Sequence, residues 1–398
     1  MNLKQLSRRA EEMPYSPIRK LASYADEAKK RGVHVFHLNI GQPDIETPVE
    51  IFKAISDYHI KVLEYGPSGG LLDLRVAVVD YHRQLGFNLD LDNVWITTGG
   101  SEAIVFAMMT VCDPGDEVIV FEPFYTNYNG FAVMSNIRLV PITTNVESGF
   151  HLPPRSDIEA KICSRTKAIL INTPNNPTGT VLTEEEMFVI YNICKEHGLF
   201  LLSDEVYREF VYDGKQHVSA LSLPEIEDHV IVIDSISKRF SACGARVGSL
   251  ISRNKTIMDR VLKFGQARLC PPTLEQVGAI AAYKNIDKYI KPMITEYQSR
   301  RNTLFQELAS IKGVYGRRPE GAFYTVLRLP VKNADHFCRW LLTDFTHDNN
   351  TVMLAPANGF YSTPGLGEQE VRIAYVLKES DLKQAVTVLQ AALSQYHN

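Results

Sequence analysis

The chain has 398 residues, of which 45% are hydrophobic and 22% charged, as in an ordinary globular protein with a substantial core. The formal net charge is −4 and lysines and arginines are scattered along the chain, which argues against nucleic acid or a membrane surface as a partner. No apolar run reaches the ~20 residues that span a bilayer, so we expect no membrane anchor.

The N-terminus and the cysteines indicate a reducing compartment. Residues 1–17 contain no apolar segment typical of a secretory signal. The six cysteines form no Cys-x-x-Cys pair and have no histidine partners at zinc spacing; they are Cys112, Cys163, Cys194, Cys243, Cys270 and Cys338. We therefore expect reduced thiols, no metal site and a cytoplasmic location.

Short apolar segments alternate with helical patterns in the middle of the chain. Strands are predicted at 94–98, 118–121, 167–172, 199–203, 230–234 and 247–252, and helices at 101–111 and 183–197. Fully apolar strands followed by helices are typical of a buried, mostly parallel sheet. From residue 286 the sequence pattern changes. It predicts a long helix at 287–308, an alternating strand, and then a further helix, strand and helix. We expect a large α/β domain at 48–285 and a smaller α+β domain formed by 1–47 and 286–398.

The strand predicted at 94–98 runs into Gly99, Gly100 and Ser101, which open a helix. Two glycines let the backbone approach a phosphate, and the free N–H groups of a helix N-terminus attract one. Ser101 could also be only a helix N-cap.

Two further strand ends carry polar or aromatic groups. Tyr125 follows the strand at 118–121, and it could stack on a flat ring or be a core aromatic. Asn176 follows the strand at 167–172 in an Asn-Asn-Pro turn. It could be only a turn residue, or it could donate to an oxygen of a cofactor.

Asp204 and Tyr207 follow the strand at 199–203. A carboxylate at a strand end in apolar surroundings needs a partner, although Asp204 could also be a helix N-cap. Tyr207 could donate a hydrogen bond to a ligand or be packed in the core.

The strand at 230–234 leads into a loop with two hydroxyls and three cations: Ser235, Ser237, Lys238, Arg239 and Arg246. Hydroxyls with an arginine suit a phosphate dianion, and a lysine beside them is placed to form a Schiff base with an aldehyde. The alternative is a solvated Lys238–Arg239 pair. Because the carboxyl ends of strands are where open α/β sheets bind ligands, we expect these five strand ends to build one site.

Four motifs give the chain a family resemblance. They are Ser235-x-Ser237-Lys238 with Gly244-x-Arg246-x-Gly248, Asn175-Asn176-Pro177-Thr178-Gly179, Gly41-Gln42-Pro43-Asp44 and Arg372-Ile373-Ala374-Tyr375. The chain resembles the fold-type I pyridoxal 5′-phosphate (PLP) aminotransferases of class I and II. The resemblance implies a large domain with a mostly parallel seven-stranded sheet and a smaller α+β domain.

The resemblance also implies roles around the cofactor. Lys238 would hold PLP as a Schiff base and move the proton, Asp204 would pair with the pyridine nitrogen, and Tyr125 would stack on the ring. Tyr207 and Asn176 would flank the phenolic oxygen. The phosphate would be bound by Gly99, Gly100, Ser101, Ser235, Ser237, Arg246 and, from the neighbouring subunit of a homodimer with a shared active site, Tyr65.

For the substrate, the resemblance assigns Arg372 to the α-carboxylate, with Gly41 and Asn176 beside it. Members that prefer dicarboxylates often carry a lysine where this chain has Ser101. Arg268 is our candidate reader of a distal carboxylate, which would favour aspartate or glutamate; the alternative is a surface or interface arginine.

The predicted function is transfer of an amino group from an L-amino acid, aspartate as first choice, to a 2-oxo acid such as 2-oxoglutarate. An alanine or aromatic aminotransferase and a PLP-dependent C–S lyase remain alternatives. A PLP-sensing transcription regulator is disfavoured because residues 1–39 are too short for a DNA-binding domain.

Overall fold

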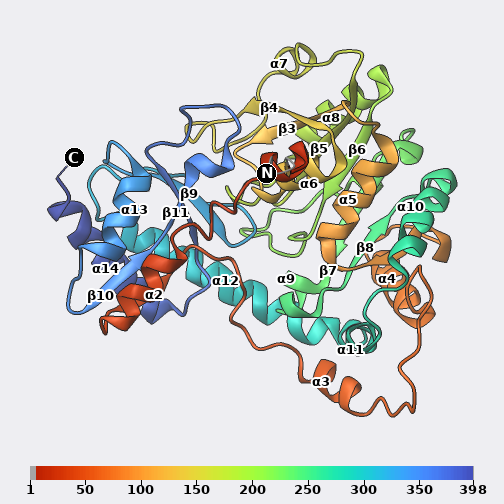
Figure 1. The fold of residues 1–398 in the computed structure, drawn as a ribbon, viewed down its shortest axis with the longest axis horizontal. Coiled ribbons are helices and arrows are strands. Elements are labelled where there is room, and N and C mark those ends of the chain that lie inside the picture. The colour runs from red at the N-terminus through yellow and green to blue at the C-terminus, as the bar shows by residue number, and fades with distance from the viewer. Residues whose placement is uncertain (1–5, 398) are drawn as a thin grey trace, which may run out of the picture.

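The centre of the molecule is a seven-stranded sheet in the order β2-β8-β7-β6-β5-β3-β4 (Figure 1). The computed structural model describes residues 6–397, so residues 1–5 of the N-terminal stretch lie outside it. β8 runs antiparallel to both its neighbours and the other pairs are parallel, which confirms the predicted α/β fold. The strands are β2 (Val94–Thr97), β3 (Glu117–Glu122), β4 (Arg138–Thr143), β5 (Thr166–Asn172), β6 (Phe200–Asp204), β7 (Val230–Ser235) and β8 (Gly248–Ile251).

The edge strand β4 was not predicted from the sequence. It contains Pro141, which cannot donate a backbone hydrogen bond and is tolerated only at a sheet edge. Because β4 pairs only with β3, the missing donor costs no ladder bond. The six predicted strands are confirmed to within one or two residues at each end.

Helices cover both faces of the sheet, because alternate residues of its strands point to opposite faces. In β3, Val118 and Val120 pack in one core with α5, α6 and α10, whereas Ile119 packs in the other with α4, α8 and α11. The helices of this part are α3 (Val49–Ser56), α4 (Leu72–Gln84), α5 (Gly99–Val111), α6 (Asn127–Ser135), α7 (Arg155–Glu159), α8 (Glu184–His197), α9 (Ile236–Arg239), α10 (Lys255–Arg268) and α11 (Thr273–Tyr283).

Two predicted helices are confirmed with small changes at their starts. Thr183 caps α8, and Glu186 completes a capping box with it. α5 begins at Gly99, two residues earlier than predicted, so the alternative reading of Ser101 as an N-cap is wrong.

Residues 22–37 pack with the C-terminal part of the chain on one side of the molecule (Figure 1). β1 (His34–His37) pairs in parallel with β10 (Asn350–Met353), and a second sheet has the order β11-β12-β9. Ala25 and Phe36 share a core with Leu304 and Phe337. The other elements of this part are α2 (Ala22–Lys30), α12 (Ile286–Leu308), β9 (Tyr324–Arg328), α13 (Ala334–Thr343), β11 (Ala355–Pro356), β12 (Glu370–Ala374) and α14 (Glu379–Gln395). The first helix, α1 (Arg8–Glu12), packs instead against α6, a helix on the large sheet (Figure 1). Among the helices of residues 6–397, none combines the length and apolar character needed to cross a membrane.

Candidate functional site

A cavity of about 520 Å³ lies where the carboxyl ends of the central strands meet segments from both ends of the chain. Twelve of the predicted site residues line it: Gly41, Gly100, Ser101, Tyr125, Asn176, Asp204, Tyr207, Ser235, Ser237, Lys238, Arg246 and Arg372. The strand ends therefore do converge on one place, for the geometric reason that the sequence suggested.

Lys238 is carried by α9, a single helical turn directly after β7. Its Nζ donates a hydrogen bond of 2.9 Å to the carbonyl oxygen of Gly41 and lies 3.5 Å from Sγ of Cys243. Within residues 6–397 the amine is thus held inside the cavity by one carbonyl and a thiol and forms no ion pair with a carboxylate.

Arg239, the next residue, points the other way and is fully buried. Its guanidinium donates to both carboxylate oxygens of Asp234 at 2.9 Å and to Glu209 at 2.8 Å. The alternative reading of a solvated Lys238–Arg239 pair is therefore wrong, because Arg239 anchors α9 in the core while Lys238 faces the cavity.

Arg246 and Gly99 fit together closely at the floor of the cavity. Gly99 has φ +74°, and a Cβ at this position would lie 2.3 Å from Nη2 of Arg246. Only glycine leaves room for the guanidinium at this helix start. Ser235 Oγ lies 2.8 Å from Ser237 Oγ on the same side of the site. Hydroxyls, an arginine and the N-terminus of α5 together form a cradle suited to a phosphate.

Asp204 ends β6 and is only 4% exposed. Its Oδ2 accepts a hydrogen bond of 2.7 Å from the hydroxyl of Tyr128, and the backbone N–H of Val206 lies 3.4 Å from Oδ1. Burial raises the pKa of Asp204 to about 6. In the described part of the chain no cation forms an ion pair with Asp204, and such a buried carboxylate is suited to a positively charged ring nitrogen, which would hold it ionised.

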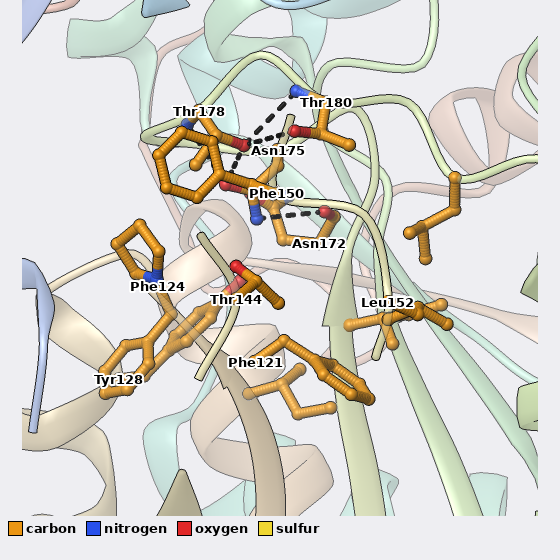
Figure 2. A pocket seen from close by; sticks show the side chains of 14 residues that line it. Phe121, Phe124, Tyr128, Thr144, Phe150, Leu152, Asn172, Asn175, Thr178 and Thr180 are labelled. Atoms are coloured by element: carbon orange, nitrogen blue, oxygen red, sulfur yellow. Dashed lines mark hydrogen bonds between the residues drawn. The ribbon is translucent and has the colours of Figure 1, made fainter. Parts of the chain in front are cut away.

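The turn that carries Asn176 is held rigid by its own side chains (Figure 2). The backbone N–H of Asn176 donates to Asn172 Oδ1 at 2.7 Å. Figure 2 shows Asn175, Thr178 and Thr180 turned toward one another, with 2.9 Å from Thr178 to Asn175 and 2.8 Å between the two threonine hydroxyls. Asn176 is therefore both a turn residue and a fixed group of the cavity wall.

Arg372 is a buried cation with a donor to spare. It is 1% exposed, Nη1 donates to Asn176 Oδ1 at 3.0 Å, and Nη2 donates to the carbonyl oxygen of Asn39. Its Nε has no hydrogen-bond partner in the described part of the chain. A buried guanidinium without a carboxylate partner is suited to the carboxylate of a ligand.

Tyrosines form the remaining wall. The hydroxyls of Tyr207 and Tyr324 lie 2.9 Å apart, and burial raises the pKa of Tyr207. Asn127 donates to the hydroxyl of Tyr125 at 2.9 Å. Tyr125 borders the cavity, so its ring is available for stacking and is not confined to the core.

Three predicted residues do not line the cavity of their own subunit. Gly99 lies directly behind it, against Arg246. Tyr65 is 77% exposed on the stretch between α3 and α4. Arg268, at the end of α10, donates to the carbonyl oxygen of Ser68 at 3.1 Å and lies 3.6 Å from Glu102.

The structure adds residues that the sequence did not reveal. Those lining the cavity are Ser16, Ile18, Arg19, Ile40, Gln42, Ile104, Asn127, Asn172, Val206, Cys243 and Tyr324. Tyr324 and the N-terminal residues reach the site by packing over long sequence separations, which leaves no local pattern. Asn127 and Cys243 lie close to predicted residues and could have been included by proximity.

Comparison with known proteins gives matches along almost the whole chain. The family model described as aminotransferase class I and II matches residues 33–389. An aspartate aminotransferase of Sulfurisphaera tokodaii is 31% identical over 90% of each chain, and an aromatic-amino-acid aminotransferase of Thermococcus litoralis is 30% identical over 98% of each. The solved alanine aminotransferase of Pyrococcus furiosus superposes with a TM-score of 0.88 at 30% identity, covering 98% of this chain and all of that one.

Proposed function

Because the chain belongs to the aminotransferase class I and II family, we propose that this aminotransferase carries PLP on Lys238 and prefers dicarboxylic amino acids such as aspartate. The observation that carries the proposal is that Lys238, Asp204, Arg246 and Arg372 share one cavity. An amine, a buried carboxylate and two arginines are the groups that PLP and an amino acid require together.

The described residues fit PLP. Arg246, with the hydroxyls of Ser235 and Ser237 and the backbone of Gly99, Gly100 and Ser101, would hold the phosphate. Asp204 would pair with the ring nitrogen, Tyr125 would stack on the ring, and Tyr207 and Asn176 would donate to the phenolic oxygen.

When bound, PLP supplies an electrophilic carbonyl carbon and a pyridinium ring that withdraws electrons from the α-carbon of the substrate. Arg372 would orient the substrate by its α-carboxylate, because the Nε donor is buried and unpaired. The amine of Lys238 would act as the general base that moves the α-proton of the substrate. Asp204 would hold the ring nitrogen protonated by its negative charge. The Gly41 carbonyl, 2.9 Å from Lys238 Nζ, would orient the amine between these transfers.

The choice of aspartate rests on relatives that are named aspartate aminotransferase. Other relatives at similar identity are named for aromatic amino acids and for alanine. Alanine and aromatic donors therefore remain alternatives. The earlier prediction that Arg268 reads a distal carboxylate requires a second subunit, because Arg268 does not line the described cavity of its own subunit.

A homodimer with a shared active site is the second part of the proposal. The stretch from α3 to α4 runs along the lower edge of the molecule in Figure 1. Several of its apolar side chains are exposed. They are Phe52, Tyr58, Ile60, Val62, Leu63, Tyr65 and Leu72, between 37% and 77% exposed. Exposed apolar groups in this density are typical of an interface with another subunit. We expect Tyr65 to reach the phosphate of the neighbouring site.

The test is the absorbance spectrum of the purified protein with PLP. We expect a visible band that disappears on adding L-aspartate and returns with 2-oxoglutarate, and we expect no such band for Lys238→Ala. A wild-type protein without the band would overturn the assignment of Lys238. Release of ammonia or pyruvate without an oxo-acid acceptor would identify a lyase instead. Light scattering of the wild-type protein at a monomer mass would contradict the dimer.

A further inference from the structure

Arg19 is a cation of the cavity that the proposed function does not use. It lies in the turn at residues 17–21, is exposed to solvent, and lines the cavity together with Ser16 and Ile18. Among residues 6–397, its side chain makes no hydrogen bond or ion pair. An unpaired arginine at a ligand cavity is available to an anion.

The backbone beside Arg19 is fixed relative to Arg372. Arg372 Nη2 donates to the carbonyl oxygen of Asn39, and the side chain of Asn39 donates to the carbonyl oxygen of Ile18 at 3.3 Å. Pro17 packs against Gly359, where a Cβ would lie 2.3 Å from the Pro17 Cβ. On the other side, Lys20 pairs with Asp335. Arg19 therefore projects from a segment whose backbone is anchored. Two hydrogen bonds, through Asn39, connect this segment to Arg372, the arginine suited to the α-carboxylate.

The cations of the cavity can be assigned to their partners one by one. Its described lining holds the cations Arg19, Lys238, Arg246 and Arg372, and the single carboxylate of Asp204. In the proposed function PLP would bind to Lys238, Arg246 and Asp204, and the α-carboxylate of the substrate would bind to Arg372. Arg19 is then the cation that has no assigned partner, and a second carboxylate on the substrate would pair with it.

Each of the other three cations already has a hydrogen-bond partner in the protein. Lys238 donates to Gly41, Arg246 donates to Cys243 O at 2.8 Å, and Arg372 donates to Asn176. Of these four cations, Arg19 is the one whose guanidinium has no protein partner within residues 6–397. Ser101, at the start of α5, supplies no cation on the opposite side of the cavity.

From these contacts we infer that Arg19 binds the distal carboxylate of a dicarboxylic substrate within its own subunit. The inference rests on the proposed function and names the residue that would select the substrate. It differs from the prediction for Arg268, whose guanidinium lies outside the cavity, donates to Ser68 through Nη2 and lies 3.6 Å from Glu102.

The experiment compares wild-type protein with Arg19→Met, which keeps an apolar stem of similar length and removes the charge. Arg9→Ala, an exposed arginine of the same segment, is the control for the change in charge, and Arg268→Ala tests the rival residue. Calorimetry of the PLP-loaded proteins measures binding of succinate, which has two carboxylates, and of butyrate, which has one. Steady-state kinetics measures kcat/KM for aspartate, glutamate, alanine and phenylalanine.

We expect Arg19→Met to weaken succinate binding and lower kcat/KM for aspartate and glutamate about 10- to 100-fold, the usual effect of losing one charge-assisted hydrogen-bonded pair. Butyrate, alanine and phenylalanine should change less than about threefold, and Arg9→Ala should resemble wild type. Unchanged succinate affinity in Arg19→Met would overturn the inference, and a loss in Arg268→Ala alone would assign the role to Arg268. If succinate binding depends on Arg19 but no amino acid is transaminated, the dicarboxylate site stands and the proposed reaction fails.

Discussion

Arg239 and Asp234 form a bidentate ion pair, with two hydrogen bonds of 2.9 Å between fully buried side chains, beneath the turn that carries Lys238. Glu209 and the hydroxyl of Tyr283 complete the partners of the guanidinium. The pair links the end of β7 to α9, so the position of Lys238 depends on a charge network that never touches the cavity. Removing one partner of such a pair leaves an uncompensated buried charge.

Replacing Asp234 with alanine should lower the free energy of unfolding by about 3–5 kcal/mol, the usual cost of breaking a buried ion pair. Urea unfolding followed by circular dichroism measures this change. Asp259→Ala is the control, because Asp259 is exposed and pairs with Arg260 and Lys263 on the surface. Asp259→Ala should lower the free energy of unfolding by less than about 1 kcal/mol. Equal losses for the two variants would show that the buried pair contributes no more than a surface one.

Gly99→Ala should weaken PLP binding about tenfold or more, because the new Cβ would meet Arg246 and the backbone has φ +74°. A positive φ costs a residue with a side chain roughly 1–2 kcal/mol. Gly244→Ala is the matched control, since that glycine lies near the site and a Cβ there meets nothing within 4 Å. Fluorescence titration of the cofactor-free proteins with PLP compares them. Similar affinities for both variants would contradict the role of Gly99.

The affinity for PLP should fall as the pH drops through about 6. Burial raises the pKa of Asp204 to about 6 in the cofactor-free protein, so below that pH the carboxyl is neutral and no longer attracts the ring nitrogen. The phosphate of PLP titrates in the same range, and Asp204→Asn removes only the contribution of the carboxylate. Titrations between pH 5 and 8 should therefore show a weaker pH dependence in Asp204→Asn. Parallel curves for the two proteins would place the titrating group elsewhere.

The stability of the cofactor-free protein should depend on His82 at mildly acidic pH. His82 is fully buried, its Nδ1 donates to Val78 O at 2.9 Å and its Nε2 accepts from Arg208 at 2.9 Å. Burial, with Arg208 beside it, lowers the pKa of His82 to about 4. Because the unfolded chain binds the proton first, stability is lost as the pH falls from about 6.5 toward 4.

Between pH 7.5 and 5 this single group should account for about 2 kcal/mol of the change in unfolding free energy. His82→Gln should reduce that pH dependence by the same amount, measured by urea unfolding at both values. An unchanged difference between the two pH values would show that His82 is not the titrating group.

Much of the fold and site could be predicted from the sequence because the relevant signals are local. Apolar β-branched runs located six of the seven central strands, and a parallel sheet brings the residues that follow such strands to one edge. This is why Asp204, Asn176 and Lys238 could be placed together without coordinates. The strand that the sequence did not predict, β4, contains Pro141. A proline lacks a backbone donor, and it is tolerated here because β4 lies at the edge of the sheet. The predicted division at residues 48 and 285, the dimer, and the roles of Tyr65 and Arg268 stay predictions.

The sequence by itself determined which polar side chains follow the strands. The periodicity of apolar residues and the turn residues at strand ends are local features of short segments, so they can be identified without the fold. Only the tertiary structure decided which of two adjacent cations faces the cavity, and it buried Arg239 while leaving Lys238 inside the site. It also decided that Tyr324 meets Tyr207 across 117 residues, and that the N-terminal segment brings Arg19 to the cavity. Such contacts depend on how distant segments pack. Side-chain direction and long-range packing are fixed only in the assembled core, so no local sequence pattern predicts them.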